Sequence, residues 1–270
     1  MPSPNISPER LLETAVRAAR TAGLHALANR HRRAETVMVA AHDVKLQLDL
    51  ECQEIALGIV RANFPDHAIL AEESADLGQP THNPSGSPYT WIIDPIDGTV
   101  NFTHGLPWWC CSVAVNHGDK TQAGVVFAPA SDELFTASRG GPARRNGQPM
   151  AVTGVSMMKE AMVLTGLDQK MTTQMPRLSL FRDIADNVQK ARVMGAAALD
   201  MCRVAAGQAD GYFEAGIYTW DVAAAGLIVE RAGGRAETLA ETAPHRLMYL
   251  ATNGHIHEEF RDFLKARLAI

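Results

Sequence analysis

The chain has 270 residues, of which 46% are hydrophobic and 20% are charged, a composition typical of a globular enzyme. The formal net charge of −5 argues against a nucleic-acid backbone as a partner, because such binding requires an extended basic stripe. Four cysteines without a Cys-x-x-Cys spacing indicate free thiols in a reducing compartment. With no leader-like N-terminus and no apolar run of roughly 18 residues, a cytoplasmic protein without membrane contact is expected.

The first half of the chain is predicted to contain two long helices and a set of strands. Ser7 can cap a helix that runs to about Ala28, and a second helix is expected over roughly 50–63. A Pro-, Gly- and Ser-rich loop is predicted over 75–88, and Asn146-Gly147 indicates a hairpin turn. Extended segments are predicted over 36–40, 43–49, 68–71, 89–93, 113–115, 124–127 and 133–137.

The second half alternates strands and helices. Helices are predicted over 175–187, 196–207, 221–232 and 255–268. Strands are predicted over 162–165, 191–193, 211–214 and 247–251. A run of strands followed by this alternation predicts an α+β fold of layered sheets and helices. A boundary is expected near 152–156, which divides the chain into an N-terminal α+β subdomain, 1–152, and a C-terminal α/β subdomain, 153–270.

The segment from Trp91 to Thr99 is the most informative part of the chain. An apolar strand leads into Asp94 and Asp97, and Gly98 and Thr99 follow at a point where a helix can begin. Carboxylates are the ligands that Mg²⁺ prefers. Backbone N–H groups at such a turn can hold phosphate. The segment therefore predicts a place where metal and phosphate meet, as phosphoryl transfer requires.

Two other uses of the aspartates are excluded by their spacing. An EF-hand needs a Glu at the twelfth loop position, and counting from Asp94 that position is Gly105. A haloacid-dehalogenase-type phosphatase carries its nucleophilic Asp two residues before the Asp of an Asp-Gly-Thr, where this chain has Pro95. A covalent phospho-aspartate therefore cannot form at this motif.

Further carboxylates stand at predicted strand ends or helix starts. Asp49, Glu72 and Asp221 each have an ordinary explanation, as a helix cap or a solvent-exposed strand end. Together with Asp94 and Asp97 they would repel one another unless cations neutralised them. The pattern suits two or three Mg²⁺ ions that bridge a phosphate and a water.

These motifs resemble the inositol monophosphatase family of Mg²⁺-dependent, lithium-sensitive phosphatases. The resemblance runs from about Leu11 to Leu264 and implies a layered α/β/α/β/α sandwich of the inositol monophosphatase/fructose-1,6-bisphosphatase type. It also implies a homodimer. The matching segments are Glu72-Glu73-Ser74, the run from Trp91 to Phe102, the run from Gly195 to Cys202, the run from Gly207 to Glu214, and the run from Trp220 to Gly226.

The resemblance implies which residues bind the metals. The first ion would be held by Glu72, Asp94 and the backbone carbonyl of Ile96. The second would be held by Asp94, Asp97 and Asp221, so that both halves of the chain build one site. A third, weaker ion would use Glu72 and water.

The resemblance also implies the catalytic and substrate-binding residues. Thr99, through its hydroxyl, and Asp49 would orient the metal-bound water, and Glu72 completes the catalytic set. The backbone N–H groups of Gly98 and Thr99 would bind phosphate. Gly195, Ala197 and Glu214 would contact the alcohol portion of the substrate. The full substrate-binding set is Asp97, Gly98, Thr99, Gly195, Ala197, Glu214 and Asp221.

The chain departs from the family pattern in a few positions. Lys45-Leu46 stands where a Val-Thr pair is usual, Val100 replaces a usual Thr, and Tyr218 stands where some members have His. Lys45 is expected to be a surface lysine, with contact to a second anionic group of a substrate as the alternative.

The expected activity is hydrolysis of inositol monophosphate, or of a similar small polyol or sugar phosphate, by a metal-activated water. Within the family, fructose 1,6-bisphosphate, histidinol phosphate and a 3′-phosphonucleotide remain alternative substrates. Outside enzymes, the alternative is a silent member that serves as a binding module. The expected partner is thus a small phosphorylated metabolite.

Overall fold

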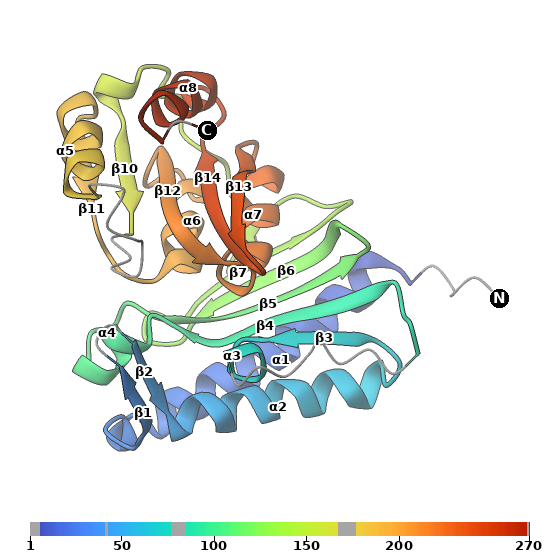
Figure 1. The fold of residues 1–270 in the computed structure, drawn as a ribbon. Helices are drawn as coiled ribbons and strands as arrows, with labels where there is room; N and C mark the ends of the chain where they lie inside the picture. The colour runs from blue at the N-terminus through green and yellow to red at the C-terminus, as the bar shows by residue number, and fades with distance from the viewer. Residues whose placement is uncertain (1–5, 41–42, 77–84, 167–176, 269) are drawn as a thin grey trace.

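The computed structural model describes residues 6–40, 43–76, 85–166, 177–268 and 270, and Figure 1 shows how they are arranged. The α-helices are α1 (Pro8–Ala28), α2 (Gln47–Asn63), α3 (Glu72–Asp76), α4 (Thr99–His104), α5 (Arg177–Asn187), α6 (Ala197–Ala205), α7 (Thr219–Arg231) and α8 (His257–Leu268). The strands are β1 (Thr36–Ala40), β2 (Asp43–Leu46), β3 (Ala68–Ala71), β4 (Tyr89–Asp97), β5 (Cys110–His117), β6 (Lys120–Ala128), β7 (Glu133–Ser138), β8 (Arg144–Arg145), β9 (Gln148–Pro149), β10 (Met162–Thr165), β11 (Lys190–Arg192), β12 (Gly211–Tyr218), β13 (Arg235–Ala243) and β14 (Arg246–Thr252).

Within the described residues, the strands form a seven-stranded sheet, a five-stranded sheet and the separate β1–β2 pair. The larger sheet has the order β3-β4-β5-β6-β7-β8-β9, with β3 parallel to β4 and the later pairs antiparallel. The smaller sheet has the order β11-β10-β12-β14-β13, with β10 parallel to both of its neighbours. The predicted run of strands in the first half is therefore confirmed, and most of its pairs are antiparallel.

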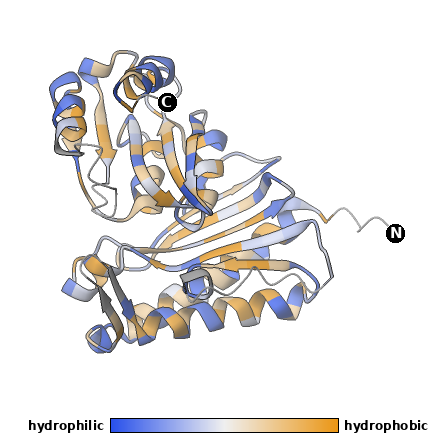
Figure 2. Ribbon diagram, in the orientation of Figure 1, coloured by the Kyte–Doolittle hydropathy of each residue, from blue (hydrophilic) through white to orange (hydrophobic). Residues whose placement is uncertain are grey.

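Helices and sheets alternate in layers (Figure 1). Helices α1 and α2 cover one face of the larger sheet, α6 and α7 lie between the two sheets, and α5 and α8 cover the outer face of the smaller sheet. This arrangement confirms the predicted α/β/α/β/α sandwich. Figure 2 shows hydrophobic and hydrophilic residues alternating along α2, as expected for a helix with one buried face. Among the described helices, none is both long and apolar enough to cross a membrane.

Helix α1 forms where the sequence predicts it. Ser7 Oγ accepts a hydrogen bond from the Arg10 N–H at 3.3 Å, and proline occupies the first turn. Small residues let the helix approach β6 closely, because a Cβ at Gly23 would lie 2.8 Å from the Phe127 ring. The buried alanines, at helical spacing, are Ala15, Ala18, Ala19, Ala22 and Ala26.

One predicted segment ends too late, and one strand has no counterpart among the predicted segments. The predicted extended segment 43–49 ends at Leu46, and α2 begins at Gln47, because the Asp49 carboxylate accepts the Leu46 N–H at 2.8 Å and caps the helix. Strand β13 was not predicted, because its sequence is rich in Ala and Glu. It forms at the edge of the smaller sheet by pairing with β14 alone, so a tertiary contact overrides its propensity.

The hairpin turn predicted at Asn146-Gly147 is confirmed. The Asn146-Gly147 pair joins β8 to β9 with positive φ angles of 49° and 79°, as a type I′ hairpin requires. The predicted loop 75–88 overlaps the last residues of α3, and its residues 77–84 lie outside the described part. Residues 175–176 of the predicted helix 175–187 also lie outside it.

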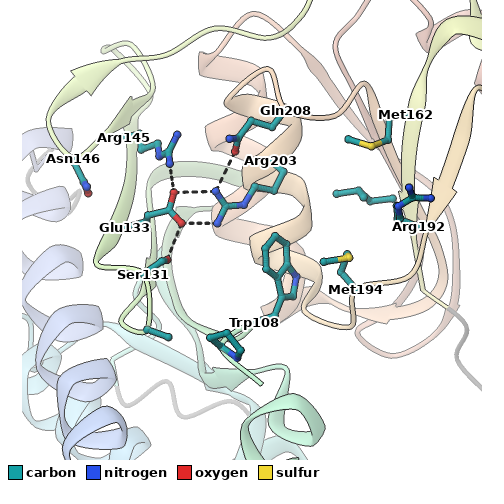
Figure 3. A pocket seen from close by; sticks show the side chains of 13 residues that line it. Trp108, Ser131, Glu133, Arg145, Asn146, Met162, Arg192, Met194, Arg203 and Gln208 are labelled. Carbon is teal, nitrogen blue, oxygen red and sulfur yellow. Dashed lines mark hydrogen bonds and ion pairs between the residues drawn. The ribbon is translucent and has the colours of Figure 1, made fainter. Parts of the chain in front are cut away.

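An ionic clamp joins α6 to the larger sheet. Arg203 of α6 donates to both oxygens of Glu133 at 2.9 and 2.5 Å, and Arg145 pairs with the same carboxylate (Figure 3). Burial alone would raise the pKa of Glu133, but the hydrogen bonds from Arg203 and Ser131 and the arginine charges lower it to about 2. The clamp fixes α6, whose N-terminal end is part of the site described below.

The closest packing between β6 and α7 supplies a test of the fold. Gly124→Ala would place a Cβ 2.7 Å from the Ala224 carbonyl oxygen, so we expect the free energy of unfolding to fall by about 1–3 kcal/mol. Gly58→Ala is the matched control, because that exposed glycine of α2 has no atom within 4 Å of the added Cβ. It should stabilise by about 0.5–1 kcal/mol in urea unfolding. Equal effects of the two changes would contradict this packing.

Candidate active site

The end of β4 carries the first two carboxylates. All of β4 except Thr90 is buried, and the strand continues through Asp94 to Asp97. In a regular strand, residues three apart face opposite sides of the sheet. Here the register against β5 shifts between Asp94 and Asp97, which is the kind of irregularity that redirects a side chain. Both carboxylates can therefore contribute to one cluster.

Three carboxylates come together at this point. Asp94, Asp97 and Asp221 each place one carboxylate oxygen within 4.8 Å of the others, and all three residues are buried. Asp221 lies in the first turn of α7, so the second half of the chain completes a cluster begun in the first half. The structure thus brings together the three carboxylates that the resemblance assigns to one ion.

Glu72 extends the acidic cluster from the first residue of α3. Desolvation of its carboxyl group raises its pKa well above the ordinary value, and the charges of Asp221, Glu73 and Asp49 add to the effect. Burial likewise raises the pKa of Asp94, with Glu72, Asp97 and Asp221 as further causes. The carboxyl groups therefore crowd one another, as the sequence predicts.

The donor set fits a hard divalent cation. Asp94 Oδ1 is buried and has no hydrogen-bond partner among the residues that the structure describes. Carboxylate oxygens in a desolvated, mutually repelling group are suited to Mg²⁺, which binds through oxygen ligands. A cation at this position would give Asp94 Oδ1 a partner and offset the repulsion.

Asp97 also fastens the cluster to α6. Its two carboxylate oxygens accept the backbone N–H groups of Ala197 at 3.1 Å and Ala198 at 2.8 Å, and the Cys110 thiol donates at 3.4 Å. Burial raises the pKa of Asp97 to about 6, and these hydrogen bonds prevent a larger rise. The N–H of Ala197, a residue predicted to contact the substrate, is therefore engaged with a carboxylate.

The turn after β4 is tightly constrained. Thr99 Oγ1 donates to the Ile96 carbonyl at 2.8 Å, so the predicted water-orienting hydroxyl touches the predicted metal-binding carbonyl. Gly98 has a φ of 88°, and a Cβ there would lie 3.0 Å from the Trp108 carbonyl oxygen and the Ala196 Cβ. Only glycine meets both conditions without strain.

Asp49 approaches the cluster from α2. It is 2% exposed, and its charge is one of the causes that raise the Glu72 pKa. Glu214 of β12 approaches from the smaller sheet, where its carboxylate accepts the Tyr212 hydroxyl at 2.5 Å. Its charge contributes to the raised pKa of Asp221, after burial and Asp97. Both predicted residues therefore interact electrostatically with the acidic cluster.

Gly195 lies at the entrance to α6 and is exposed, with a φ of 84°. Its carbonyl accepts the side-chain amide of Asn101 at 3.2 Å, and the same amide donates to the carbonyls of Trp108 and Met194 at 2.9 Å. Sequence reasoning assigned no role to Asn101. A polar residue two positions after the Gly-Thr turn was the available signal for this loop-fixing contact.

The prediction for Lys45 is wrong. Its side chain is buried, not on the surface, and Nζ lies 3.0 Å from Glu73 Oε2. The sequence could not show this pair, because its partners lie 28 positions apart on different elements.

Comparison with known proteins identifies the family. A family model described as the inositol monophosphatase family matches residues 7–269. The chain belongs to the inositol monophosphatase family. The resemblance inferred from the motifs is thereby confirmed over nearly the whole sequence.

Curated relatives carry two kinds of name. The chain is 38% identical over 228 residues to "Nus factor SuhB" of Pasteurella multocida, which covers 83% of each chain. It is 37% identical over 230 residues to "Inositol-1-monophosphatase" of Synechocystis, covering 84% of this chain and 78% of the relative. Among solved structures, inositol monophosphatase from Anabaena superposes with a TM-score of 0.83 at 32% identity, over 96% of each chain. The phosphatase class predicted from the sequence is confirmed by this membership.

The acidic cluster predicts how metal and pH affect stability. The folded-state pKa of Asp97, about 6, exceeds the unfolded value of about 3.8, so the folded metal-free protein holds the extra proton between those pH values. Its free energy of unfolding should therefore fall by up to about 3 kcal/mol as the pH rises from 4 to 6. Mg²⁺ should reverse the loss. Urea unfolding in EDTA and in Mg²⁺ across this range measures both effects.

Matched variants make this test specific. Asp94→Asn removes one repelling carboxylate, so its metal-free stability should depend less on pH and respond less to Mg²⁺. Asp119→Asn changes an exposed carboxylate and should behave as wild type. Identical pH profiles with and without Mg²⁺ in the wild-type protein would contradict a cation site here.

Proposed function

We propose that the protein is a Mg²⁺-dependent phosphomonoesterase that hydrolyses inositol monophosphate or a similar small polyol or sugar phosphate. The observation that carries the proposal is the buried cluster of Asp94, Asp97 and Asp221, gathered beside the Gly98-Thr99 turn. Family membership supports the reaction class. The presence of every proposed metal carboxylate supports an active enzyme over a silent binding module.

The proposed metal ligands are those that the family resemblance implies, and three of them lie in the acidic cluster. Glu72, Asp94 and the Ile96 carbonyl would hold one Mg²⁺, and Asp94, Asp97 and Asp221 a second. Glu72 with water would hold a third, weaker ion. Bound here, Mg²⁺ would supply Lewis-acid chemistry and lower the pKa of a coordinated water.

The chain's own residues would position the reactants. Asp49 and the Thr99 hydroxyl would orient the attacking water, and the Gly98 and Thr99 N–H groups would bind the phosphate. The alcohol would lie beside Gly195, Ala197 and Glu214. Since the Ala197 N–H already donates to Asp97, Ala197 would contact the substrate through its methyl group. The subdomains 1–152 and 153–270 would then work as one unit, because Asp221 completes the site.

We further propose a homodimer that forms across the face shown in Figure 3. A cavity of about 800 Å³ opens there, lined by Trp108, Met194 and Arg192 among others. Leu106 and Val193, which adjoin lining residues in the sequence, are 53% and 45% exposed. A cavity with exposed apolar residues next to it in the sequence could be covered by a second copy of the chain, and the proposal rests on this feature together with the dimer that the resemblance implies.

Phosphate release across a substrate panel tests the proposed activity. Inositol 1-phosphate, fructose 1,6-bisphosphate, histidinol phosphate and adenosine 3′,5′-bisphosphate should be offered with Mg²⁺, with EDTA and with added Li⁺. We expect turnover of inositol 1-phosphate that needs Mg²⁺ and is inhibited by Li⁺. Asp94→Asn should lower the rate of turnover by about 100-fold or more, because the metal that stabilises the transition-state charge loses a ligand.

The exposed Asp119→Asn variant is the control and should retain full activity. Preference for another phosphate on the panel would contradict the proposed substrate but not the reaction. Turnover that persists in EDTA would contradict the metal-dependent mechanism.

Sedimentation velocity tests the proposed dimer. Wild type should sediment with twice the mass of one chain, and Val193→Asp should shift it toward the monomer, because a buried unpaired carboxylate is costly. Leu24→Asp is the control, since Leu24 is equally exposed, at 45%, but lies on α1 in the outer helical layer. A monomeric wild-type protein would contradict the dimer.

A further inference from the structure

A buried ion pair lies directly beside the proposed metal site. Lys45 of β2 is 7% exposed, Glu73 of α3 is 3% exposed, and Lys45 Nζ lies 3.0 Å from Glu73 Oε2. Burying two charges costs solvation free energy, which their attraction repays only in good geometry. Such a pair is therefore a weak source of stability and calls for another explanation.

The pair belongs to a network around the first turn of α3. The Glu73 N–H donates to Gln53 Oε1 at 3.1 Å, and Gln53 Nε2 donates to Ser74 Oγ at 3.2 Å. Gln53 lies on α2 and is buried. Lys45 holds the side chain of Glu73 while Gln53 holds its backbone and the next residue. The turn that carries Glu72 is thus fixed from both β2 and α2.

Glu72 and Asp49 are the functional neighbours of this network. Glu72 precedes Glu73 in α3, and the Glu73 charge is one of the causes that raise the Glu72 pKa, after desolvation and Asp221. Lys45 is followed by Leu46, whose N–H donates to Asp49 at 2.8 Å. The ion pair therefore joins β2, which leads to the proposed water-orienting residue Asp49, to the first turn of α3, which carries the proposed metal ligand Glu72.

We propose that Lys45 is a positioning residue of the metal site, which acts through Glu73 to hold the Glu72 carboxyl group in place for a divalent cation. The inference rests on the proposed Mg²⁺ site. It explains why a charged side chain occupies a buried position of β2. Partners that orient metal ligands without touching the metal commonly change metal affinity by about 10–100-fold when they are removed.

Positioning and simple charge balance predict opposite effects of removing Lys45. If Lys45 and Glu73 acted only through charge, loss of the lysine would tighten cation binding and loss of the glutamate would weaken it. If the pair positions Glu72, loss of either partner weakens binding. The lysine variant therefore separates the explanations by the direction of the change, whereas both explanations predict weaker binding when the glutamate is lost.

Mn²⁺ titration of the metal-free full-length protein, followed by the electron paramagnetic resonance signal of free Mn²⁺, is the test. We expect Lys45→Met and Glu73→Gln each to bind Mn²⁺ about 10-fold or more weakly than wild type. Lys45→Arg, which keeps the positive charge and a donor, should recover most of the affinity. Lys190→Met, at an exposed lysine of β11, is the control and should bind as wild type.

The double variant Lys45→Met/Glu73→Met guards against misfolding of a single variant, because it removes both buried charges together. It should fold, as judged by thermal unfolding in EDTA, and still bind Mn²⁺ more weakly than wild type. Wild-type affinity in this variant, or opposite changes in the two single variants, would overturn the positioning role. Absence of Mn²⁺ binding by wild type would instead overturn the proposed metal site itself.

Discussion

The rest of the structure depends on the mutual repulsion of buried carboxylates. Asp94, Asp97 and Asp221 lie within reach of one another in the interior, and the Glu72 carboxyl group adds a further acid. A buried acidic group of this kind lowers folded-state stability unless protons or cations offset its charge. The stable layers around it therefore support an arrangement that is unfavourable by itself. The same property makes the cluster suitable for binding cations.

The fold meets this constraint by bringing several elements to one point. The end of β4, the first turn of α7 and the start of α3 supply the carboxylates, and α6 donates two N–H groups to Asp97. Helices α6 and α7 lie between the sheets, so the site forms only when the layers are assembled. The Glu133–Arg203 clamp ties α6 to the larger sheet and thereby steadies the support of Asp97.

Long-range polar pairs are where sequence reasoning fails in this protein. Lys45 alternates with apolar neighbours, which favours a surface position in a two-sided strand, yet it is buried against Glu73. Asn101 and Arg203 likewise act on segments distant in the chain. Strand β13 shows the same limit for secondary structure, because pairing with β14 outweighs the helical propensity of its alanines and glutamates.

The sequence by itself determined the family-defining acidic motifs, the caps and turns such as Ser7 and Asn146-Gly147, and most strands and helices. These depend on local spacing, which a linear chain displays directly. Only the tertiary structure decided which carboxylates meet, that Asp97 takes the N–H groups of α6, and that Lys45 is paired in the interior. Those outcomes depend on burial and on contacts between distant segments, and neither exists until the layers pack.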